Sequence, residues 1–134
     1  MKVVGTIFIK ENKLLLVKSS RRTTYQLPAG KVENGETILE AAIRECHEEL
    51  GKYAIFNEEK IKYLTNFNEI ASSDNKTIIN YYLFIYEGTL EGRLTESEEI
   101  EDFVWYQTTM ENIVLSNSLK NKIIPYCIKE NLIK

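Results

Sequence analysis

The segment Thr37–Leu50 constrains the fold of this chain more than any other stretch. Its apolar residues recur at helical spacing and predict one buried stripe, formed by Leu39, Ala42, Ile43, Cys46 and Leu50. Thr37 and Glu40 fit a capping box at its start, and Gly51 follows where a left-handed cap ends helices. The sequence therefore predicts a helix over 37–50, whose stripe the rest of the chain must cover.

Strand-like segments lie on both sides of this helix. They are rich in β-branched and aromatic residues and span 3–9, 14–18, 60–67, 77–86 and 102–106. Strands arranged around one strongly amphipathic helix indicate a mixed α+β sandwich.

The remaining segments are expected to form turns, loops and a second helix. The polar residues 10–13 predict a hairpin turn, residues 28–30 an irregular loop, and residues 72–75 another turn. Near the C-terminus, apolar residues spaced by four predict helix, but Pro125 is expected to kink this helix or to divide it in two.

Composition narrows the class of protein. The chain has 134 residues, 43% of them hydrophobic, and no repeat or linker, which fits a single globular domain over 1–134. The net charge of −3 argues against a nucleic-acid polymer as partner, and no apolar run approaches the roughly 20 residues that span a membrane. Cys46 and Cys127 lack metal-ligand spacing and are expected to be reduced thiols, as in a cytoplasmic protein. A monomer and a homodimer both remain open.

Three glutamates gather on one side of the predicted helix. Glu45, Glu48 and Glu49 fall within an arc of roughly 100°, and the apolar stripe is centred roughly 120° away. Like charges this close repel, and the negative end of the helix dipole adds to the cost. Clustered carboxylates are suitable ligands for Mg²⁺ or Mn²⁺. From spacing alone, a solvated acidic face neutralised by Arg44 is an equal alternative.

The region 30–52 resembles the box motif of the Nudix hydrolases. That motif is a Gly, five positions, Glu, seven positions, then Arg-Glu, an aliphatic residue, any residue, Glu-Glu, any residue, Gly and a final aliphatic residue. The matching residues here are Gly30, Glu36 and the run Arg44-Glu45-Cys46-His47-Glu48-Glu49-Leu50-Gly51. Lys52 departs from the final aliphatic position, and Tyr53 or Ile55 is expected to take over its packing role.

The resemblance implies an α/β/α sandwich with a mixed sheet, and hydrolysis of nucleoside diphosphates linked to another group with Mg²⁺ or Mn²⁺. The metal ligands that it implies are Glu45, Glu48, Glu49 and the backbone of Gly30. For Glu45 the alternative to a metal ligand is a general base for the attacking water, and Glu36 is implied as a support for the loop or the metal shell. Arg44 is expected to orient the carboxylates by charge-assisted hydrogen bonds.

Residues outside the motif are expected to complete the site. Relatives recruit a further acid from a distant loop, and Glu99 is favoured here over Glu98 and Glu101, with a solvated loop as the alternative. The expected substrate contacts are Lys18, Arg21 and Arg22 to phosphates, and Tyr25 and Tyr82 to a base. For the aromatic residues, a place in the core is the alternative. His47 has no partner that suggests a catalytic role.

The implied reaction is Mg²⁺-dependent hydrolysis of a phosphoanhydride bond in a small nucleotide, such as a nucleoside triphosphate. The products would be a nucleoside monophosphate and pyrophosphate, as in the MutT-like branch of the family. Three alternatives remain: a nucleotide-sugar or dinucleotide pyrophosphatase of the same family, a non-catalytic nucleotide-binding domain on this fold, and an acidic interaction module.

Overall fold

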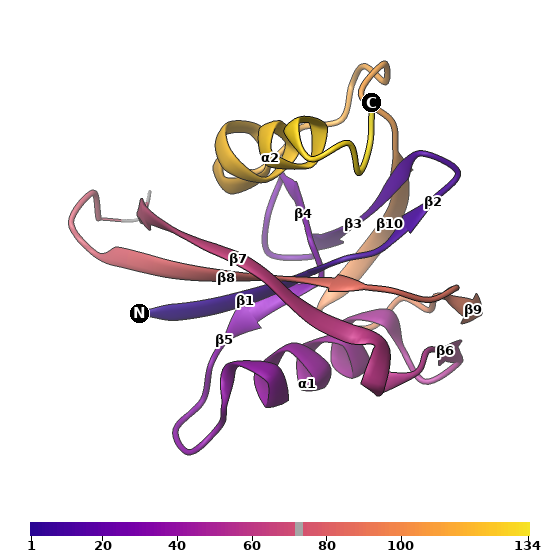
Figure 1. Ribbon diagram of the computed structural model, residues 1–134, viewed down its shortest axis with the longest axis horizontal. Helices are drawn as coiled ribbons and strands as arrows, with labels where there is room; N and C mark the ends of the chain where they lie inside the picture. The colour runs from indigo at the N-terminus through magenta and orange to yellow at the C-terminus, as the bar shows by residue number, and fades with distance from the viewer. Residues whose placement is uncertain (72–73) are drawn as a thin grey trace.

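The computed structural model describes residues 1–71 and 74–134 (Figure 1). Its main sheet has the strand order β5 (Ala29–Lys31), β1 (Lys2–Ile7), β8 (Ile78–Tyr86) and β7 (Ile61–Ile70). β1 runs parallel to β8, and the other neighbouring pairs are antiparallel, so the sheet is mixed. The predicted turn at 72–75 includes Ser72 and Ser73, which lie outside the described residues.

The second sheet is formed by β10 (Ile100–Tyr106), β3 (Lys13–Ser19) and β2 (Ile9–Lys10), and β4 (Tyr25–Gln26) also pairs with β3. A small third sheet joins β6 (Ala54–Ile55) to β9 (Glu91–Gly92). The predicted hairpin turn is confirmed between β2 and β3. Glu11 and Asn12 both have positive φ there, at 51° and 65°, as a two-residue type I′ turn requires.

Two strand predictions need correction. The run predicted over 3–9 is divided between two sheets, because β1 ends at Ile7 and β2 begins at Ile9. The loop predicted over 28–30 contains β5, whose Gly30 lies opposite Val4 of β1 in an antiparallel pair. A strand of three residues is too short for an alternating pattern, so its pairing partner defines it rather than its own sequence.

The helix α1 (Ile38–Leu50) begins and ends where the sequence predicts. Thr37 accepts a hydrogen bond from the Glu40 N–H, and the Glu40 carboxylate accepts one from the Thr37 N–H, which completes the capping box. Gly51 follows with φ of 86° and ψ of 168°, so it ends the helix outside the left-handed helical region that was predicted, in a conformation that is likewise open almost only to glycine.

The C-terminal helical segment is continuous rather than broken. A π-helical turn, Leu119–Ile123, leads directly into α2 (Ile124–Lys129), with Pro125 in the first turn of α2. Proline has no N–H to donate to the carbonyl four residues earlier, and a wider turn before it accommodates the ring without ending the helix.

A short 3₁₀ turn, Glu58–Lys60, precedes β7. In the described residues, no helix is both long enough and apolar enough to cross a membrane.

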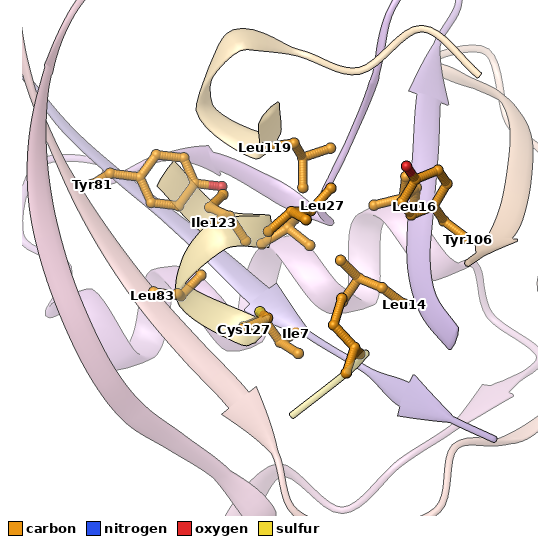
Figure 2. Close-up of a cluster of buried hydrophobic side chains, with 12 residues drawn as sticks. Ile7, Leu14, Leu16, Leu27, Tyr81, Leu83, Tyr106, Leu119, Ile123 and Cys127 are labelled. Atoms are coloured by element: carbon orange, nitrogen blue, oxygen red, sulfur yellow. The ribbon is translucent and has the colours of Figure 1, made fainter. Parts of the chain in front are cut away.

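The two helices cover opposite faces of the main sheet, which confirms the α/β/α sandwich (Figure 1). Side chains alternate along β1, so Val4 and then Phe8 beyond its end pack beneath α1. Ile7 joins the other core cluster, which Leu119, Ile123 and Cys127 of the C-terminal segment complete (Figure 2). This two-sided burial holds β1 and its neighbour β5 in place beside α1.

Leu83 of β8 is fully buried at the centre of the sheet, whereas Ile78 of the same strand is 58% exposed. We expect Leu83→Ala to lower the free energy of unfolding by about 2–5 kcal/mol, because it leaves a cavity in the core. Ile78→Ala is the matched control and should cost less than about 1 kcal/mol. Urea unfolding followed by circular dichroism measures both values, and equal losses would contradict the assigned burial.

Candidate active site

The glycine of β5 and a glutamate of α1 lie in direct contact. A Cβ placed on Gly30 would overlap the Glu45 carboxylate, so only glycine leaves space for that carboxylate beside the strand backbone. The Glu45 side chain is only 13% exposed as a result. The spacing between the strand and the helix therefore fixes an acidic group against the β5 main chain.

Arg44 connects the loop that follows β5 to the acidic side of α1. Its Nε donates to Glu36 Oε2 at 2.7 Å, and its Nη2 donates to Glu36 Oε1 at 3.0 Å. Its Nη1 donates to Glu45 Oε1 at 2.8 Å, and Nη2 also reaches the Lys31 carbonyl at 2.9 Å. The contacts of Nη1 with the Glu48 oxygens are longer, at 3.3 and 3.4 Å. A single guanidinium thus holds the loop and the helix together.

The charges around Arg44 reinforce one another. Hydrogen bonds from Arg44, together with the Glu33 N–H, lower the pKa of Glu36 to about 2. The Glu36, Glu45 and Glu48 carboxylates in turn raise the pKa of Arg44 above its ordinary value. Glu36 is therefore ionised at any physiological pH and serves as the fixed counterion of this arginine.

Glu49 occupies the least solvated position of the acidic group. It is 9% exposed and accepts a hydrogen bond from the Ala29 N–H at 2.6 Å. Burial raises its pKa to about 8, and the nearby charges of Glu45, Glu99 and Glu48 add to this effect. Burial likewise raises the pKa of Glu45, while Arg44 opposes that increase.

The buried side of α1 differs from the predicted stripe. Its buried residues are Ala41, Ala42, Cys46, Glu49 and Leu50. At about 100° per residue, this sector is turned by roughly 60° from the predicted stripe toward the glutamates, and Glu49 lies near its middle. Leu39, expected in the stripe, is 43% exposed in the first turn. A stripe drawn from apolar residues alone misses this rotation, because the Glu49 carboxylate occupies part of the buried sector.

A pocket of about 530 Å³ lies beside Glu49. Its lining residues are Ser19, Arg21, Arg22, Gln26, Glu49, Glu99 and Ile100. The loop that carries Glu99 is held in place by Ser20, whose Oγ donates to the Glu98 carbonyl at 2.7 Å and whose N–H donates to the Glu99 carbonyl at 2.8 Å. The structure therefore brings Glu99, Arg21 and Arg22 together with an acid of the helix.

Three predicted substrate contacts are placed elsewhere. The Lys18 ammonium pairs with Glu101, and neither it nor Tyr25 or Tyr82 lines the pocket beside Glu49. The Tyr25 hydroxyl donates to Asp102, and this bond raises the Tyr25 pKa to about 12. Tyr82 packs against the core beneath α1, as the alternative interpretation had it.

The packing role expected of Tyr53 or Ile55 belongs to other residues. Both of these side chains are exposed, and Tyr53 instead carries the cations of Lys52 and Arg93 on its ring. Ala54 and Phe56 pack against the core beneath α1. The residues of this short segment that face the core are therefore one position further along the chain than predicted.

A second pocket, not predicted from the sequence, adjoins the first. This pocket has a volume of about 360 Å³, shares Arg22 and Gln26 with the first pocket, and extends past Gly30 to Tyr81 and Glu69. We call it the Glu69 pocket. One signal was available: Glu69 is the single charged residue in the stretch 63–71. Its partner Ser118, whose Oγ donates to Glu69 Oε2, lies 49 residues away and carries no such signal.

The donor set suits a hard divalent cation, although the carboxylates do not converge in this structure. Among residues 1–71 and 74–134, no three His, Cys, Asp or Glu side chains are arranged to hold a metal ion. Glu45 and Glu49 are engaged by Arg44 and by the Ala29 N–H. Glu48 is the acid most free to turn, because its side chain is 51% exposed and its contacts with Arg44 are long. Carboxylate and carbonyl oxygens are ligands that Mg²⁺ and Mn²⁺ accept.

Comparison with known proteins identifies the family. The sequence profile of the NUDIX domain matches residues 1–125, and the chain belongs to this family. A Nudix hydrolase of Bacillus subtilis, YvcI, is 37% identical over 54 residues, which are 40% of this chain and 34% of that protein. An RNA pyrophosphohydrolase of Francisella tularensis subsp. mediasiatica is 45% identical over 42 residues, 31% of this chain and 27% of that protein. The chain thus matches about a third or less of the length of these curated relatives.

The fold is also that of solved Nudix structures. The crystal structure of a MutT NUDIX hydrolase from Burkholderia pseudomallei has a TM-score of 0.71 at 22% identity. The similarity covers 89% of this chain and 92% of that one. The fold expected from the box motif is therefore confirmed.

The buried Glu49 carboxylate predicts a dependence of stability on pH in the metal-free protein. Its folded pKa of about 8 exceeds the ordinary value of 4.5, so the folded state retains a proton that the unfolded state releases between these values. Stability should therefore fall as pH rises from about 5 to 8, by at most about 1.4 kcal/mol per pH unit for one proton. Urea unfolding in EDTA measures this slope. Glu49→Gln should flatten it, and an unchanged slope in that variant would refute the assignment.

Proposed function

We propose that this chain is a divalent-metal-dependent pyrophosphohydrolase that acts on a nucleoside triphosphate or another small nucleoside-diphosphate-linked compound. The observation that carries the proposal is the placement of Glu49 and Glu99 in one pocket with Arg21 and Arg22. Acids that attract a cation and guanidiniums that bind phosphate oxygens are the two kinds of group that phosphoanhydride hydrolysis needs.

The side chains of the site have separable roles in this proposal. Arg21 and Arg22 bind the phosphate oxygens and orient the chain of phosphates. Arg44 holds Glu45 in the contact with Gly30, where burial raises the pKa of the carboxyl and makes Glu45 a stronger base. Glu45 accepts the proton of the attacking water, and Glu99, which lines the pocket, is the alternative base.

Nudix hydrolases generally use a divalent metal, and Mg²⁺ or Mn²⁺ is proposed here. The residues that would hold it are Glu48, Glu49 and the Gly30 carbonyl, together with whichever of Glu45 and Glu99 does not act as the base. When bound, such a cation neutralises charge on the phosphate oxygens and lowers the pKa of a bound water. Glu36 stays with Arg44 and keeps the loop closed against the helix.

Removing a metal-binding acid should abolish turnover while the fold remains. We expect Glu48→Gln to lower kcat by about 100-fold or more, because one charged ligand is lost from an electrostatic site. Release of pyrophosphate from nucleoside triphosphates in Mg²⁺ measures this, and EDTA should stop the reaction. His47→Gln is the matched control on the same helix and should keep turnover within about twofold of the wild type.

The substrate panel separates the proposed branch from its relatives. It contains nucleoside triphosphates, nucleotide sugars, dinucleotide polyphosphates and a 5′-triphosphorylated oligoribonucleotide, the last because one relative is an RNA pyrophosphohydrolase. Hydrolysis of triphosphates to monophosphate and pyrophosphate supports the proposal. Full activity of Glu48→Gln, or hydrolysis in EDTA, refutes the metal-dependent mechanism.

A further inference from the structure

The Glu69 pocket combines apolar walls with one carboxylate. Its walls include Ile79 and Tyr81 of β8, and Leu119 and Ile123 of the π-helical turn. Figure 2 shows Tyr81 with Leu119 and Ile123 in the core cluster beside the C-terminal segment. One aromatic ring, several aliphatic side chains and a volume of about 360 Å³ suit a nucleotide base. Among the described residues that line it, Glu69 is the one acid.

The Glu69 carboxylate is held in a defined orientation. The Ser118 hydroxyl donates to Oε2, which joins the end of β7 to the start of the C-terminal helical segment. Among the described residues this is the one donor to the carboxylate, and it leaves the other oxygen, Oε1, and further lone pairs available to a ligand, because an ionised carboxylate accepts about four hydrogen bonds. Asn117, next in sequence to Ser118, also lines the pocket and offers both an amide donor and an acceptor.

The Glu69 pocket adjoins the pocket in which the phosphates are proposed to bind. Arg22 and Gln26 line both pockets, and the Glu69 pocket passes along Gly30 and Lys31. A nucleotide whose phosphates lie beside Arg21 and Glu49 would therefore extend its base toward Glu69.

We propose that Glu69 is the specificity-determining residue for the base and that it selects guanine, an inference that rests on the proposed function. Guanine presents two adjacent N–H donors, at N1 and at the 2-amino group, which match the two oxygens of a carboxylate. Adenine places a lone pair at N1, cytosine pairs one amino donor with a ring acceptor, and uracil flanks one N–H with two carbonyl oxygens. Each of these bases would leave the carboxylate underpaired or facing another acceptor, and the partial burial of Glu69 makes such a mismatch costly.

Binding of monophosphates in EDTA tests the inference without catalysis. By isothermal titration calorimetry, the wild type should bind GMP about tenfold or more tightly than AMP or IMP, since IMP lacks only the 2-amino group. Glu69→Gln replaces one acceptor by a donor and should bring the GMP to IMP ratio close to one. Glu111→Gln, which removes an exposed acid outside both pockets, should leave the ratio unchanged.

A second variant guards against a merely structural effect. Ser118→Ala keeps the carboxylate but removes the hydroxyl that orients it, so the ratio should fall only in part while thermal unfolding shows an intact fold. Equal binding of GMP and IMP by the wild type overturns the inference. The inference is also overturned if Glu69→Gln weakens the binding of every ribonucleoside monophosphate equally but does not weaken the binding of dGMP. The carboxylate would then contact the ribose rather than the base. A protein that prefers GMP but hydrolyses no nucleotide refutes the proposed function and leaves this inference standing.

Discussion

The hydrogen bonds of Arg44 are the interaction on which the rest of the site depends. One guanidinium ties β5 and the loop after it to α1 through the Lys31 carbonyl and Glu36, and it also partly neutralises Glu45 and Glu48. Without it, three acids near the negative end of a helix would repel one another with little compensation. The bidentate geometry that a carboxylate and a guanidinium share explains how one residue can carry both tasks.

The fold also holds a carboxylate, that of Glu49, in a buried position that costs free energy. Glu49 turns toward the sheet rather than toward water and is compensated by a single main-chain donor, the Ala29 N–H. A buried carboxylate costs free energy unless it is paired or protonated, and its raised pKa records that cost. Two complete core clusters, one under each helix, supply the stability that allows such a group to persist.

Local sequence predicted the features that local chemistry determines. The capping box, the Gly51 cap and the Glu11–Asn12 turn each follow from a few neighbouring residues. β5, the rotation of α1 and the Glu69–Ser118 pair depend on partners distant in sequence, and no single stretch encodes them. At the candidate site, the motif located the acids of the helix. It could not separate Arg21 and Arg22, which line a pocket, from Lys18, which Glu101 already pairs.

The parallel pairing of β1 with β8 has a consequence for synthesis of the chain. Residues 2–7 pair with residues 80–85, so one edge of β1 has no partner until the chain has been synthesised as far as residue 85. Until then β1 presents apolar residues such as Val4 and Ile7 together with unpaired peptide groups. Closure over so long a loop is slow, and the growing chain is open to aggregation during that interval.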